Sequence, residues 1–186
     1  MPTRQLMVTQ IKCLDDTSEG GSDAPYLMVF MGHRNVPGGK LIRVRDPDWD
    51  GAFLAGKTMN MRQIVNEAEA GGAFVFAWLL EEDFDPDLGS GGVLQLMMQS
   101  VWNIYGGSAW ANLNSDQLRS IVRPKLTDLL KSTLSNDEYL GSHSFVVPLV
   151  TTETSLSPLS YSGDGGSYKI TFTVRIKGAE PAWRRL

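Results

Sequence analysis

The sequence predicts a mainly β protein, an antiparallel β-sandwich with a two-helix insertion in the second half of the chain. Short apolar runs rich in β-branched and aromatic residues alternate with turns rich in Gly, Ser and Asp, as in antiparallel folds. Residues 93–105 instead have apolar side chains at helical spacing. With 186 residues, the chain is long enough for one domain. We expect that domain over residues 1–180, with a flexible tail at 181–186.

Five strands are predicted before the helices. The first contains Val8, Ile11 and Cys13, and a long acidic turn separates it from the second. The fifth is the most apolar and aromatic, and it runs directly into acidic residues. The fourth segment fits both a period of two and a helical period, and we favour a strand there. The second to fifth strands are expected at residues 26–31, 40–45, 57–65 and 73–81.

Two helices follow in the middle of the chain. The first spans residues 93–105, whose spacing is typical of a largely buried helix, so Met97 and Met98 are expected in the core. The second begins after Asn114, which can form a capping box with Gln117. Pro124 lies inside this helix and should bend or interrupt it, because proline has no amide donor.

Two more strands are expected after the helices, at residues 144–151 and 167–177. Both segments are short and contain several apolar residues. A stretch rich in Ser, Gly and Pro, residues 154–166, separates them and reads as a loop. The prediction is thus about seven strands in total, with the helices inserted late in the chain.

Composition limits the classes of function. The formal net charge of −4 argues against a nucleic-acid-binding protein with a broad basic face. The single cysteine, Cys13, cannot form an intramolecular disulfide, and a buried structural thiol is expected there. No stretch approaches the roughly 20 apolar residues of a membrane-spanning helix, and the first residues lack a secretory signal. We therefore expect a cytoplasmic protein, or one exported by a non-classical route.

One acidic cluster resembles half of a calcium-binding loop. Asp46, Asp48 and Asp50 occupy alternate positions and are followed by Gly51, like the first half of an EF-hand loop. The second half differs, because Lys57 stands at the twelfth position, where a bidentate acid is required. An EF-hand is therefore not expected, but the half-loop can hold calcium in another scaffold.

Two further acidic clusters are candidate metal ligands. Glu81, Asp83, Asp85 and Asp87 directly follow the fifth predicted strand, and carboxylates so close together repel one another unless a cation neutralises them. A looser cluster with Asp16 and Asp23 follows the first strand. Several acidic loops that converge at one end of a sandwich could together complete a calcium site. The alternative is that these residues only solubilise the surface and form turns.

The strand that ends in acidic residues and continues through Asp83, Asp85, Asp87 and Gly89 resembles the third calcium loop of C2 domains. The loop with Asp16 and Asp23 is similar to the first loop of that family. The resemblance covers about the first 90 residues. It implies a β-sandwich that binds calcium between loops at one end and then engages a membrane or protein surface. The chain departs from the family in the two helices that follow, and it has no basic strand of the kind that binds phosphoinositides.

Other candidate sites are weaker. His33 and His143 lie far apart, neither in a paired metal-binding motif, and no glycine pair has the spacing of a phosphate-binding loop. No catalytic constellation is visible, so we expect a non-enzymatic, calcium-binding module. The alternative is a structural or interaction protein, including a toxin or membrane-active subunit. Its contacts would come from the helices, where Trp102, Tyr105 and Trp110 could form an assembly face.

Overall fold

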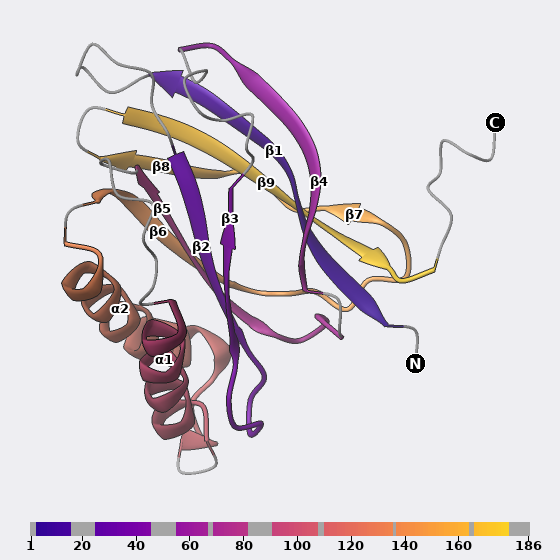
Figure 1. Ribbon diagram of the computed structural model, residues 1–186. Helices are drawn as coiled ribbons and strands as arrows, with labels where there is room; N and C mark the ends of the chain where they lie inside the picture. The colour runs from indigo at the N-terminus through magenta and orange to yellow at the C-terminus, as the bar shows by residue number, and fades with distance from the viewer. Residues whose placement is uncertain are drawn as a thin grey trace.

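The computed structural model contains two antiparallel sheets and two helices, which confirms the predicted mainly β class (Figure 1). It describes residues 3–15, 25–45, 55–66, 69–81, 91–107, 110–135, 137–163 and 166–178. The elements in chain order are β1 (Arg4–Asp15), β2 (Pro25–Gly32), β3 (Lys40–Val44), β4 (Thr58–Asn66), β5 (Phe74–Glu81), α1 (Gly91–Tyr105), α2 (Ser115–Thr133), β6 (Glu138–Val146), β7 (Thr154–Ser155), β8 (Leu159–Gly163) and β9 (Gly166–Ile176).

The molecule has three layers. One sheet has the strand order β4-β1-β9-β7, with β8 also paired to β9, and the other has the order β3-β2-β5-β6. The two helices cover the outer face of the four-stranded sheet, on the side away from the five-stranded sheet (Figure 1). The ambiguous segment at residues 57–65 forms strand β4, as favoured from its sequence.

The first core lies between the two sheets. Val8 and Ile11 from β1 pack there with Val29 from β2, Val75 from β5 and Phe172 from β9. All are fully or almost fully buried, as expected where alternate side chains of two sheets face each other. Cys13 belongs to this core and its side chain is fully buried, as expected from its apolar position in the first strand.

The second core lies between the four-stranded sheet and the helices. The other sheet covers one face of β2 and β5, and the helices cover the other face. Both strands are therefore buried on both faces, which explains their continuous apolar sequences. Trp102 from α1 is fully buried against Phe74 and Phe76, with ring centroids 5.5 and 6.1 Å away. Gly32 at the end of β2 permits this packing, because a Cβ there would lie only 2.5 Å from the indole of Trp102.

Helix α2 begins as predicted and runs without a break past Pro124. The Asn114 side chain accepts a hydrogen bond from the backbone N–H of Gln117, and the Gln117 side chain accepts one from the backbone N–H of Asn114. This reciprocal pair is the predicted capping box. The expected interruption at Pro124 is wrong, since one helix runs from Ser115 to Thr133. Pro124 is exposed, and four buried side chains hold the helix on the sheet: Leu118, Val122, Leu126 and Leu130.

Strand predictions after the helices are partly wrong. β6 starts at Glu138, earlier than expected, because residues 138–143 pair with β5 although their sequence contains a glycine and short polar residues. The expected loop at 154–166 contains the strands β7 and β8, both paired with β9. β9 itself matches the predicted strand at 167–177. Nine strands are therefore present among the described residues instead of seven.

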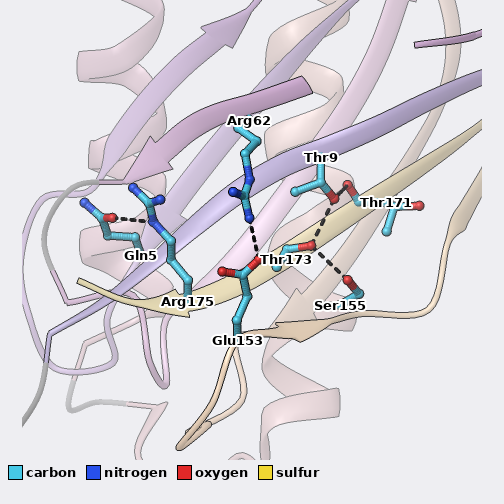
Figure 2. A network of polar contacts seen from close by, with 8 residues as sticks. All are labelled: Gln5, Thr9, Arg62, Glu153, Ser155, Thr171, Thr173 and Arg175. Carbon is cyan, nitrogen blue, oxygen red and sulfur yellow. Dashed lines mark hydrogen bonds and ion pairs between the residues drawn. The ribbon is translucent and has the colours of Figure 1, made fainter. Parts of the chain in front are cut away.

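Polar side chains cover the outer face of the five-stranded sheet (Figure 2). The hydroxyl of Thr173 on β9 lies 2.9 Å from that of Thr9 on β1 and 3.1 Å from that of Ser155 on β7. Arg62 on β4 forms an ion pair with Glu153 at 2.6 Å. The hydroxyl contacts join neighbouring strands, and the ion pair links β4 to the residue before β7, so the polar groups of this face bind one another in a structural network.

Candidate functional site

Four strands of one sheet begin or end at the same edge. Pro25, the first residue of β2, pairs with Glu81, the last residue of β5, and Glu81 pairs with Glu138 at the start of β6. Leu27 pairs with Val44, so β3 ends at the same edge. The segments 16–24, 46–54 and 82–90, which carry the predicted acidic clusters, therefore all connect to one end of this sheet.

The five-stranded sheet reaches the same end of the sandwich. Asp15, the last residue of β1, pairs with Ser167 on β9. Next to it, Gly163 and Gly166 close the β8–β9 hairpin. A Cβ at Gly163 would lie 2.6 Å from the carbonyl oxygen of Tyr139 on β6, so this hairpin lies against the start of β6. Figure 1 shows β1 ending beside the start of β2 at this end.

Of the predicted metal ligands, only Glu81 falls within the described residues. It is half-buried, at the carboxyl end of β5, where the sequence predicted the end of a strand. The other predicted ligands lie outside the described residues: Asp16, Asp23, Asp46, Asp48, Asp50, Asp83, Asp85 and Asp87.

The structure adds acidic residues that were not predicted as ligands. Asp137 directly precedes β6 and Glu138 begins it, next to the end of β5, and the buried Tyr26 donates a hydrogen bond from its hydroxyl to the Asp137 carboxylate. The sequence signal for them is an acidic pair directly before the strand residues Tyr139 and Leu140, whereas Glu81 was marked by its place at the end of an apolar run. It was hidden because this segment reads as a turn.

Positive charge is also present at this end of the sandwich. The guanidinium carbon of Arg43 lies 4.1 Å from the centre of the Tyr26 ring, a cation–π contact. Arg43 on β3 pairs with Met28 on β2, which is two residues after Tyr26. The guanidinium of Arg43 and the carboxylate of Asp137 therefore both contact Tyr26 at this edge. A metal ion bound at this edge would add its positive charge to that of Arg43.

Within the described residues, no group of three or more His, Cys, Asp or Glu side chains is close enough to hold a metal ion. The described carboxylates at this end, Asp15, Glu81, Asp137 and Glu138, come from three strands of two sheets. A cation with six to eight oxygen ligands would therefore need ligands from the connecting segments as well.

The histidines have structural partners. His33 Nε2 lies 2.9 Å from the carbonyl oxygen of Glu69, and His143 Nε2 lies 2.6 Å from that of Ser160. The ring of His143 also contacts Tyr161 edge-on, with centroids 4.7 Å apart. Neither histidine lies in a group that could hold a metal within the described ranges.

Of the three aromatic residues considered from the sequence for an assembly face, Trp102 is not available. Trp102 is fully buried, as its core alternative predicted. Tyr105 and Trp110 pack on each other with ring centroids 5.5 Å apart, and both are only partly exposed. Of the two methionines expected in the core, Met98 is buried but Met97 is 43% exposed.

No helix of the described residues is long and apolar enough to cross a membrane. No protein-family model matches the chain, and no curated protein matches its sequence. Among solved structures, the chain is similar to human GIVD cytosolic phospholipase A2 in complex with a methyl γ-linolenyl fluorophosphonate inhibitor and terbium chloride. The identity is 6%, the TM-score is 0.35, and the match covers 94% of this chain and 17% of that one. At this score the similarity supports no conclusion, and what stands is a β-rich, antiparallel two-sheet fold.

Proposed function

We propose that the protein is a non-enzymatic, calcium-binding β-sandwich module whose metal site lies at the end where β2 and β6 begin and β3 and β5 end. The proposed ligands come from the acidic residues that flank this end. They are Asp16, Asp23, Asp46, Asp48, Asp50, Glu81, Asp83, Asp85 and Asp87, to which the fold adds Asp137 and Glu138.

The observation that carries the proposal is the strand register. Pro25 pairs with Glu81, and Glu81 pairs with Glu138, so the start of β2, the end of β5 and the start of β6 lie in one row across the sheet. Three acidic segments that are separate in the sequence therefore start or finish at the same edge. This arrangement allows several segments to supply oxygens to one cation, and calcium takes six to eight oxygen ligands.

Electrostatics supports the same site. Carboxylates gathered at one end of a fold repel each other, and this repulsion destabilises the folded state until a cation is bound. Calcium suits such a site better than magnesium, because calcium accepts flexible geometry at 2.3–2.6 Å whereas magnesium demands a near-ideal octahedron. Tyr26 contributes by holding the carboxylate of Asp137 in place before the metal arrives.

Isothermal titration with calcium and with magnesium tests the proposal. We expect binding of calcium in the micromolar to millimolar range, with weaker or no binding of magnesium. A variant with Asp83→Asn, Asp85→Asn and Asp87→Asn keeps the size of these side chains but removes their charge, and it should lose calcium binding. The matched control is Glu153→Gln, which removes one carboxylate from the outer face of the other sheet, far from the site, and should bind calcium normally. Absence of calcium binding to the unmodified protein would reject the proposal.

The resemblance to C2 domains suggests what calcium is for. We propose that calcium orders the acidic segments and thereby permits association with a protein or membrane surface. A second candidate is a protein-interaction module whose acidic residues only solubilise the surface. The exposed apolar side chains of α1 favour this second candidate, and binding of a partner in the presence of EDTA would support it.

A further inference from the structure

Helix α1 has two apolar faces, of which the fold buries one. Leu94, Met98 and Trp102 are fully buried against the four-stranded sheet. On the outward face Val93 and Leu96 are 58% and 63% exposed, followed along the helix by Met97 and Ile104 at 43% and 60%. A helix that covers a sheet normally turns polar residues to solvent, and one that is apolar all round is normally buried on both sides. The outward face of α1 therefore calls for a partner.

The outward face has the spacing of a helix–helix seam. Val93, Met97, Ser100 and Ile104 follow each other at steps of four, three and four residues, the heptad spacing of helices that pack in pairs. Ser100 does not oppose burial there, because its hydroxyl already donates a hydrogen bond to the carbonyl oxygen of Leu96 at 2.9 Å. Its small side chain also leaves room for a large residue from a facing helix.

The charge pattern favours a second copy of the same chain as the partner. α1 contains no Asp, Glu, Lys or Arg, whereas flanking charges are what normally select a different partner helix. A copy of α1 meets no like charge when it packs on this seam. An anionic membrane is disfavoured, because surface-bound helices carry Lys or Arg beside their apolar face, and this chain has a net charge of −4.

We infer that two copies of the protein associate through α1, with the helices antiparallel about a two-fold axis. In that arrangement Val93 of one copy faces Ile104 of the other, and Met97 faces the small Ser100, so large and small side chains interlock at the centre. The antiparallel orientation also sets the positive end of each helix dipole beside the negative end of the other. Val36, which is 55% exposed and lies near the carboxyl end of α1, extends the apolar surface.

The size of the seam sets the expected strength. A stable dimer buries about 800 Å² on each partner, and one helix of four turns supplies less than a full interface of that size. We therefore expect a weak dimer with a dissociation constant on the order of micromolar. Both the monomer and the dimer should be measurable at accessible concentrations.

Sedimentation equilibrium of the full chain at about 1–300 µM tests this inference. We expect the average mass to rise from that of the 20.5 kDa monomer towards twice that value. Measurement in EDTA makes the result independent of the proposed calcium site. Met97→Glu should keep the protein monomeric at every concentration, because it sets two like charges in the seam. Leu149→Glu is the matched control, since Leu149 is 70% exposed and lies after β6, and this variant should still dimerise.

Disulfide trapping tests the orientation. We expect Val93→Cys protein mixed with Ile104→Cys protein to cross-link between the two variants in preference to cross-linking within either one. Circular dichroism at a concentration well below the dissociation constant, where the unmodified protein is monomeric, should show that Met97→Glu unfolds at the same temperature, so that loss of the dimer is not loss of the fold. A monomer at all concentrations, a dimer that survives Met97→Glu, or preferential cross-linking within each variant would overturn the inference.

Discussion

The hydroxyl of Tyr26 donates a hydrogen bond to the carboxylate of Asp137. This contact joins the first residues of β2 to the residue before β6, and β5 lies between these two strands. Tyr26 is fully buried, so its ring is held by packing and its hydroxyl has a fixed position. The carboxylate of Asp137 is therefore oriented at the end of the sheet to which the acidic segments connect. This contact links the core between sheet and helices to the proposed metal site.

Tyr26→Phe is expected to distinguish the effect of orienting the Asp137 carboxylate from the effect of its charge. It removes the hydroxyl but keeps the ring, and therefore keeps the contact with Arg43. We expect a loss of about 1–3 kcal/mol in the free energy of unfolding, because a hydrogen bond to a charged group is lost. Calcium affinity should fall modestly, whereas Asp137→Asn, which removes the charge, should lower it more. Urea unfolding and calcium titration measure both effects. Equal calcium affinity in the two variants and the unmodified protein would exclude Asp137 from the site.

Tyr161→Phe is expected to keep or raise stability. Tyr161 is 1% exposed, and its hydroxyl has no hydrogen-bond partner among the described residues. Replacing it with Phe removes a buried polar group that gains nothing from burial. We expect the free energy of unfolding at pH 7 to rise by up to about 1–3 kcal/mol. Urea unfolding tests this, and a loss of stability would mean that the hydroxyl has a partner.

Tyr161 should also make the protein less stable against unfolding at alkaline pH. Burial, and then the neighbouring Tyr139, raise the pKa of Tyr161 far above its ordinary value. Above about pH 10 an unfolded tyrosine releases its proton while the folded protein retains it, so the unfolded state binds fewer protons and unfolding becomes easier. The free energy of unfolding should therefore fall as pH rises above about 10, by up to about 1.4 kcal/mol per pH unit from this group. Tyr161→Phe should show a smaller decline, and an identical decline would contradict the assignment.

Gly32→Val is expected to disrupt the packing of α1. A Cβ at this position would lie 2.5 Å from the Trp102 indole, and the larger valine side chain would displace the ring. Overpacking of this kind typically costs about 1–3 kcal/mol, and thermal unfolding should report it. Gly56→Val is a control for the loss of glycine, because no atom lies within 4 Å of its Cβ position, although its positive φ adds backbone strain. Near-ultraviolet circular dichroism should change at Trp102 in the first variant alone.

Asn114→Ala is expected to destabilise α2. The substitution removes the side chain that accepts the hydrogen bond from Gln117, and loss of such a cap typically costs about 0.5–2 kcal/mol. Asn114→Asp retains the acceptor and should restore most of the loss. Chemical unfolding of the three proteins measures the difference, and equal stability of the Ala and Asp variants would show that the cap contributes nothing.

Much of the fold could be predicted because its signals are local. The capping box at Asn114 and the apolar run of β5 depend on neighbouring residues, and both were found. β6 was placed too late because the residues around Gly141 form a strand only through their pairing with β5, with an irregularity between Leu79 and Leu80. Tertiary pairing outweighed local propensity there.

The candidate site was predictable only in part, for a related reason. Glu81 was identified because it ends a strongly predicted strand, and its position was correct. Its alignment with Glu138 depends on the register between β5 and β6, and two helices separate these strands in the sequence. Likewise, nothing local marks Asp137 as the partner of Tyr26. The exposure of Met97 was missed because helical spacing shows that a helix is apolar on two faces but not which face the sheet covers.

Thermal unfolding in excess EDTA, and then with about 10 mM calcium, tests the calcium proposal most directly. A ligand that binds only the folded state raises its stability by about 2.7 kcal/mol at one hundred times the dissociation constant. For a chain of this length that corresponds to a rise of roughly 5–10 °C in Tm. We predict such a rise with calcium, a smaller one with magnesium, and none in the variant with Asp83, Asp85 and Asp87 changed to Asn. An unchanged Tm of the unmodified protein on addition of calcium would contradict the proposal.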